Sequence, residues 1–288
     1  MGRLLADVQV GRRSTERKRM AGPLVVFMSL VAALVASPAS GIVGGRLDGN
    51  RHPGVGFMIG YDENGESFYG CSGTLVRPTV FVTAAHCLGG LTFLQPSAVT
   101  VTFGAQIPID SETIPVPTVE ISGEPFPNPA FQDDDNLLTY AQIAEDYGVI
   151  VLDEPATAVF SGLTTYALPA KGHLERKLNK STFEVVGYGI SATAKHFKDL
   201  DFDGYRRYAI MNGKGASLRP PSVLELNGNP NGSQAEEGVT CSGDSGGGVF
   251  DGSILVAVHS ASNFCISKSY NARLDVQSAI DFLTPFLD

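Results

Sequence analysis

The residues Val239-Thr-Cys-Ser-Gly-Asp-Ser-Gly-Gly-Gly248 decide how this chain is interpreted. Ser245 is flanked by glycines, so it suits a tight turn on which its hydroxyl and nearby backbone N–H groups face one point. The N–H groups of Gly243 and Ser245 suit the oxyanion that forms when a hydroxyl attacks a carbonyl. A serine hydroxyl needs a base to take its proton, so the stretch predicts a histidine and an orienting carboxylate elsewhere. An ordinary glycine-rich turn is the alternative interpretation.

The predicted histidine lies in Phe81-Val-Thr-Ala-Ala-His-Cys87, just after a short apolar run that is typical of a β-strand. Val-Thr-Ala-Ala-His-Cys together with Cys-x-Gly-Asp-Ser-Gly-Gly resembles the chymotrypsin/trypsin family of serine proteases, from Ile42 to the C-terminus. The resemblance implies an all-β fold of two six-stranded antiparallel β-barrels with a C-terminal helix. It also implies a serine endopeptidase that needs no cofactor and no metal, with His86 as its general base and acid.

The carboxylate of the site is predicted to precede a buried strand. Asp146 stands before the apolar run Val149-Ile-Val-Leu152 and resembles the family's Asp-Ile-Ala-Leu-Leu pattern. The chain order His86, Asp146, Ser245 is that of chymotrypsin and differs from the orders in subtilisins and α/β-hydrolases. Asp146 would orient the imidazole and stabilise it when protonated. The run Asp133–Asp135 is the alternative carboxylate, but no apolar run follows it.

Residues 1–41 are typical of an export signal. The basic run Arg17-Lys-Arg19 precedes an apolar stretch from Pro23 to Ala36, which is short for a membrane span. We therefore expect a secreted, extracellular protein with no stable membrane association after signal cleavage. An uncleaved anchor is the alternative interpretation, and the long basic region leaves Met20 open as the start.

The join between signal and domain predicts how the chain is processed. Ile42-Val-Gly-Gly45 resembles the mature N-terminus of the family, whose free amine inserts into the protein. The resemblance implies an ion pair between the Ile42 ammonium and Asp244, since a buried charge needs a partner. Small residues at Ala39 and Gly41 fit a signal-peptidase site, so one cut after Gly41 would serve both export and activation.

Four cysteines allow three disulfide pairings. The resemblance implies two bridges: Cys71 with Cys87 beside the histidine, and Cys241 with Cys265 between the serine loop and the wall of the specificity pocket. The chain has no Cys-x-x-Cys motif, which disfavours a zinc or thioredoxin-like site.

The predicted specificity pocket is the part of this sequence that departs most from the family's pattern. Trypsins carry an aspartate six residues before the nucleophile, where this chain has Val239 followed by Thr240. The resemblance puts Ser260 and Ser262 in the pocket wall, and counting back from a tyrosine puts Lys268 there too. We expect no preference for cleavage after Lys or Arg. The first prediction is a small or apolar residue before the scissile bond, and the second is an acidic residue there. A loop shift that leaves Lys268 in solvent remains open.

Two acidic stretches are weak candidates for calcium. Residues 199–204 match the opening Asp-x-Asp-x-Asp-Gly of a calcium loop, but Ile210 stands where that loop has its bidentate glutamate. Residues 133–135 are typical of a solvated face. An acidic surface turn is the alternative for the first stretch.

The 288 residues can bury a large core, with a first barrel predicted over about 42–160 and a second over about 161–288. Six of the 21 basic residues and two of the 30 acidic ones fall in residues 1–41, so the rest carries a charge of −13. That balance disfavours nucleic acid as a partner. We expect a monomer that acts on proteins or peptides and meets protein inhibitors. The alternatives are a catalytically silent, protease-like binding protein and an esterase.

Overall fold

The computed structural model describes residues 40–89, 95–110, 115–132, 139–177, 181–192, 202–213, 222–230 and 236–287. Residues 38–288 form one compact unit, and the fold below is that of this unit. All but the last two residues of the predicted signal lie outside the described residues, as do Asp133–Asp135 and residues 199–201.

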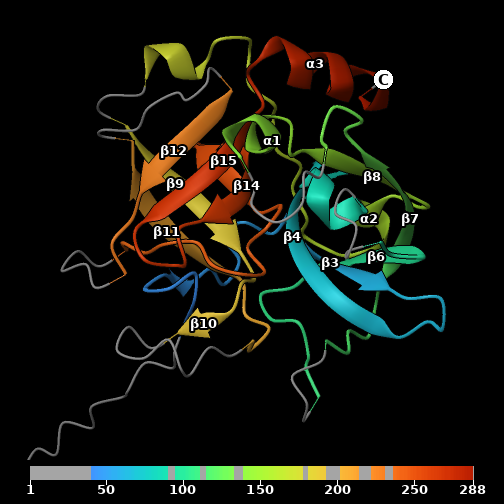
Figure 1. The fold of residues 1–288 in the computed structure, drawn as a ribbon. Helices are drawn as coiled ribbons and strands as arrows, with labels where there is room; N and C mark the ends of the chain where they lie inside the picture. Colours follow the sequence, from blue (N-terminus) through green and yellow to red (C-terminus); the bar gives the residue numbers. More distant parts are fainter. Residues whose placement is uncertain are drawn as a thin grey trace, which may run out of the picture. The chain divides into compact units, whose positions relative to one another are not determined.

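Six antiparallel strands close the first barrel in the order β3-β4-β5-β8-β7-β6, drawn from blue to green in Figure 1. The first three strands are rich in β-branched and aromatic residues, and β5 is buried at all four positions, as a central strand requires. The bounds are β3 (Val55–Tyr61), β4 (Ser67–Arg77), β5 (Val80–Thr83), β6 (Ala98–Thr102), β7 (Ile121–Pro127) and β8 (Gly148–Leu152).

The second barrel runs in the order β12-β15-β14-β13-β9-β11, and a pairing between Asn212 and Asn227 closes it. Two antiparallel six-stranded barrels are thus present, and the predicted fold class is confirmed. A short strand before the first barrel, β2 (Arg46–Leu47), joins the outer edge of β11. The bounds are β9 (Thr182–Gly187), β11 (Arg207–Asn212), β12 (Val223–Asn227), β13 (Gly248–Asp251), β14 (Ile254–Ser262) and β15 (Lys268–Arg273).

The remaining elements are short. The predicted C-terminal helix is present as α3, which buries Ala279 and Leu283. Across the described ranges, no helix has the length and apolar content needed to cross a membrane. The bounds are β1 (Ser40–Gly41), which pairs with β10 (Ser191–Ala192), then α1 (Tyr140–Ala144), α2 (Ala156–Val159) and α3 (Gln277–Leu283), with 3₁₀ turns η1 (Ala85–Leu88), η2 (Leu174–Arg176) and η3 (Thr284–Phe286).

A buried charged cluster lies where the two barrels meet. Arg206, just before β11, donates from Nε to Asp48 Oδ2 at 2.8 Å and from a terminal nitrogen to Val55 O at 2.9 Å. His52 Nδ1 lies 2.5 Å from Asp48 Oδ1, and its Nε2 lies 3.1 Å from Glu184 Oε2. Since both Arg206 and Asp48 are buried, their charges depend on each other for compensation.

Candidate active site

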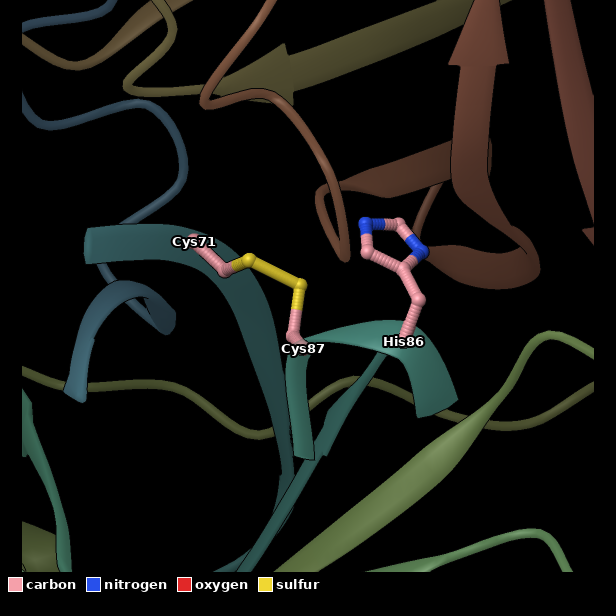
Figure 2. Close-up of side chains that lie close together, drawn as sticks. All are labelled: Cys71, His86 and Cys87. Atoms are coloured by element: carbon pink, nitrogen blue, oxygen red, sulfur yellow. A yellow bond between two sulfur atoms is a disulfide. The ribbon is translucent and has the colours of Figure 1, made fainter. Parts of the chain in front are cut away.

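His86 lies in η1, the turn that follows β5, and its side chain is buried. Gly89 ends the turn with φ of 95°, a conformation that favours glycine. The Cys71–Cys87 disulfide ties this turn to β4, and Figure 2 shows the bridge beside the imidazole. The second predicted bridge, Cys241–Cys265, is also present, so both predicted pairings are confirmed.

The atoms that Cys71, His86 and Cys87 could offer to a metal ion lie within 4.8 Å of one another. Cysteine binds metal as a thiolate, and both sulfurs are bonded to each other here (Figure 2). The cluster is therefore a disulfide next to a histidine and lacks the donors of a metal site.

Asp146 follows α1, whose first turn is held by a capping box between Thr139 and Gln142. Its fully buried carboxylate lies 2.7 Å from His86 Nδ1 and accepts from His86 N at 2.9 Å. Ser260 Oγ donates to the same carboxylate at 2.5 Å. Burial alone would raise the pKa of Asp146, but the charge and hydrogen bonds of His86, with the bond from Ser260, hold it below its usual range. An ionised Asp146 accepts from Nδ1–H, so the lone pair of the neutral imidazole stands on Nε2.

Ser245 lies on the predicted turn, between Gly243 with φ of 87° and Gly246 with φ of 80°. A Cβ on Gly246 would overlap main-chain and side-chain atoms of β4 and β5, so this turn needs glycine for space as well as for conformation. Ser72 N donates to Ser245 O at 2.7 Å, which fixes the turn against the first barrel. Within the described residues, no hydrogen bond joins Ser245 Oγ to the His86 imidazole.

The N–H groups of Gly243 and Ser245 donate no hydrogen bond to any described residue. The surrounding main chain is well fixed: Ser72 Oγ donates to Gly243 O at 2.9 Å, and Asp244 N donates to Cys241 O at 3.1 Å. Two unused donors on a rigid turn are what an oxyanion requires.

Asp244 is buried, and its carboxylate accepts from Gly189 N and Cys241 N, both at 2.8 Å. Burial raises the pKa of Asp244 to about 7, although these two bonds and the charge of Arg207 act in the opposite direction. Ile42 is also buried, with φ of 45°, which is strained for a β-branched residue. The chain is continuous through Gly41–Ile42, so an ion pair between Ile42 and Asp244 stays a prediction.

The family model named Trypsin matches residues 43–283. This chain belongs to the trypsin family.

Solved structures of the trypsin fold resemble the chain over 85–86% of its length. HL collagenase is 18% identical, with a TM-score of 0.60 over 98% of that chain. The scabies mite inactivated protease paralogue S-D1 is 17% identical, with a TM-score of 0.58 over 97% of that chain. A mutant of human heparin binding protein is 20% identical, with a TM-score of 0.60 over 98% of that chain. No curated protein matches the sequence. At these identities the likeness establishes the trypsin fold alone.

The predicted pocket residues of this trypsin-family chain fall in different surroundings. Val239 and Thr240 are buried, and Thr240 Oγ1 has no hydrogen-bond partner among the described residues. Ser262 Oγ accepts from Cys265 N at 3.3 Å, whereas Ser260 Oγ donates to the Asp146 carboxylate.

Lys268 lies on the face of β15 that also carries Tyr270, next to α1, and its Nζ pairs with Glu225 on β12. The opposite face carries Ser269, whose hydroxyl contacts His259 at 2.9 Å. His259 and Ser269 were not predicted as site residues from the sequence. Alternation along β15 places Ser269 on the face opposite Lys268, but it gives no signal for His259 on β14.

The one aspartate of the calcium-like stretch that is described, Asp203, pairs through both carboxylate oxygens with the Arg207 guanidinium at 2.7 Å. A bidentate guanidinium occupies the oxygens that a cation would use, so Asp203 is better explained as the partner of Arg207 than as a cation ligand.

Proposed function

We propose that this trypsin-family chain is a serine endopeptidase that works through an acyl-enzyme at Ser245. The observation that carries the proposal is the buried Asp146 carboxylate, held by His86 Nδ1 at 2.7 Å and by Ser260 Oγ at 2.5 Å. That arrangement leaves His86 Nε2 as a base, in a fold whose nucleophile turn offers Ser245 and two unused N–H groups.

In the proposed reaction His86 Nε2 takes the Ser245 proton while Oγ bonds to the substrate carbonyl carbon. The negative oxygen accepts from the N–H groups of Gly243 and Ser245. His86 then returns the proton to the amine that leaves, and an ester remains on Ser245. Water, deprotonated by the same nitrogen, cleaves the ester and regenerates the hydroxyl. Asp146 stays ionised and stabilises each imidazolium.

Specificity and location are further parts of the proposal. Val239 supports an enzyme without preference for Lys or Arg, because no carboxylate is offered at that position. Two disulfides and the apolar stretch 23–36 support an exported protein. We expect protein or peptide substrates, protein inhibitors as further partners, and a monomer.

A panel of fluorogenic peptides and simple esters tests the activity, with Ser245→Ala as the matched control. Cleavage of internal peptide bonds by the wild type alone supports the proposal. Hydrolysis of esters without any peptide cleavage would make the chain an esterase, and a panel dominated by Arg or Lys substrates would contradict the expected specificity.

The second candidate is a catalytically silent, protease-like binding protein. The observation that favours it is the lack of a hydrogen bond between Ser245 and His86 within the described residues. One structural neighbour is an inactivated protease paralogue and another is a mutant of a heparin binding protein. Equal, background cleavage by the wild type and by Ser245→Ala would favour this candidate.

A further inference from the structure

The disulfide beside His86 is a feature of the site that the proposed reaction does not use. Cys71, His86 and Cys87 are all buried, and the atoms that they could offer to a metal ion lie within 4.8 Å of one another. Across the described ranges, no other group of three Cys, His, Asp or Glu side chains meets in this way. The second disulfide, Cys241–Cys265, belongs to no such group and serves as an internal comparison.

Reduction of the Cys71–Cys87 bridge turns two bonded sulfurs into two potential ligands. A dithiol achieves this by exchange: its two thiols become a disulfide, and Cys71 and Cys87 each receive one electron and one proton. A zinc ion then displaces both thiol protons to solvent, because a coordinated thiol is deprotonated. The two thiolates cancel the charge of the ion, so the buried group gains no net charge that needs another partner.

The spacing of the three side chains suits a tetrahedral ion. Zinc lies about 2.3 Å from sulfur and about 2.0–2.1 Å from an imidazole nitrogen, so its ligands stand about 3.6–3.8 Å apart. The present separations are no larger than 4.8 Å, a difference that side-chain rotation can remove. The Cα atoms of Cys71 and Cys87 are 6.4 Å apart, against about 5.5–6 Å across most bridges, which leaves room for the sulfurs to separate.

His86 already has the orientation of a metal ligand. Its Nδ1–H bonds to the buried Asp146 carboxylate at 2.7 Å, which leaves the lone pair on Nε2. In Figure 2, Nε2 is the ring nitrogen farther from the main chain, and it stands on the side of the disulfide. Metal-bound histidines almost always donate their other N–H to a carboxylate, a carbonyl or water, and Asp146 supplies that partner here. Two cysteines and one histidine form a known set of zinc ligands, with water in the fourth position.

We propose that the reduced form of this chain binds zinc through Cys71, Cys87 and His86 Nε2, and that the ion switches the protease off. Zinc occupies the lone pair that would otherwise take the Ser245 proton. When the bridge re-forms, the two thiolates give two electrons to an oxidant, the S–S bond returns and the ion leaves. Since the cytosol keeps thiols reduced and disulfides persist outside it, zinc would keep the chain silent until export. The metal site does not depend on the proposed function, but the loss of activity rests on it.

The first test measures metal binding without activity. Protein reduced with a phosphine is titrated with Co²⁺, whose thiolate complexes absorb in the near ultraviolet, and then with zinc, which displaces the cobalt. We expect one ion per chain in the reduced wild type, and none in the oxidised protein or in reduced Cys71→Ser/Cys87→Ser, which keeps the second cysteine pair. Asp146→Asn should weaken zinc binding about 10–100-fold, as the loss of a carboxylate partner does. A reduced wild type without a thiolate–cobalt band overturns the proposal.

Thiol labelling locates the ion in the wild-type chain, without a variant that could fail to fold. Reduced protein is treated with iodoacetamide, with and without zinc, for a time that modifies all four cysteines in the zinc-free sample, and the adducts are mapped by mass spectrometry. Zinc at ten times its Kd should slow labelling of Cys71 and Cys87 about tenfold and leave Cys241 and Cys265 unchanged. Equal protection of both pairs, or protection of neither, overturns the proposed site.

Peptide cleavage tests the switch itself. Zinc should abolish cleavage by the reduced wild type, a chelator should restore it without reoxidation, and the oxidised enzyme should be unaffected. Equal inhibition of the oxidised and reduced forms overturns the switch. Reduced protein that stays inactive in chelator also overturns it, because the loss of the bridge rather than the ion is then responsible. Selective protection of Cys71 and Cys87 in a chain that cleaves nothing in either state retains the metal site and removes the proposed peptidase function.

Discussion

Replacing Asp48 by Asn should destabilise the protein strongly, because it removes the counter-charge of a buried guanidinium. The carboxylate accepts from Arg206 Nε at 2.8 Å and from His52 N at 3.0 Å, and contacts His52 Nδ1 at 2.5 Å. Asn keeps the shape of the side chain, but its amide would place a donor against one of these donors. Breaking a buried pair by removing one partner costs about 3–5 kcal/mol.

The assay is the loss of folded protein on heating under oxidising conditions, checked by urea unfolding. A change of this size corresponds to a fall in Tm of roughly 6–20 °C for a domain of this size. Asp251→Asn is the matched control: it removes the same charge from a carboxylate that Lys177 and His173 share nearer the surface, and it should cost less than Asp48→Asn. If Asp48→Asn proves no more destabilising than Asp251→Asn, the barrels do not depend on this buried charge.

Three further predictions concern the pH dependence of stability, the orienting role of Asp146 and the turn that carries Ser245. Burial alone would lower the pKa of His52, but hydrogen bonds to its two carboxylate partners raise it. The stabilising effect of His52 is therefore present below about pH 6.5 and is lost as pH rises through its folded-state pKa. The difference in unfolding free energy between wild type and His52→Gln should shrink with rising pH, and a difference that grows contradicts the assignment. Asp146→Asn should lower kcat by about 10⁴-fold, because the imidazole loses its fixed tautomer, while the circular dichroism spectrum is kept; a fall of less than about tenfold argues against the orienting role. Gly246→Ala should reduce the unfolding free energy more than Gly252→Ala, since both glycines have positive φ but only Gly246 lacks space for a Cβ. Equal losses of unfolding free energy would show that the neighbours of Gly246 move to make room for the Cβ.

The fold and much of the candidate site could be predicted because short motifs encode them. The turn of Ser245 and the histidine before Cys87 follow from local patterns, and the family resemblance implies both disulfides. Asp146 lies where its following apolar run suggests, next to His86. Ser260, expected in the pocket wall, also donates to Asp146, a contact that the sequence did not predict.

The pairs of side chains that meet between β14 and β15 could not be predicted. The pairing of these strands shifts register between His259 and Ala261, so an extra residue on β14 changes which side chains meet across the sheet. Counting along the sequence alone therefore selected Lys268 and missed His259. The Asp48–Arg206 pair joins residues 158 positions apart, and no local pattern signals such a contact.

The most direct measurement of the central claim is labelling with a fluorophosphonate, located by mass spectrometry. It should be done on protein whose N-terminus has been sequenced, beside the variants Ser245→Ala and His86→Ala. We predict a single adduct on Ser245 in the wild type, with none in Ser245→Ala and far slower labelling in His86→Ala, because the base activates the hydroxyl. Protein that starts at Ile42 and yet shows no adduct on Ser245 would contradict the claim that this serine is an activated nucleophile.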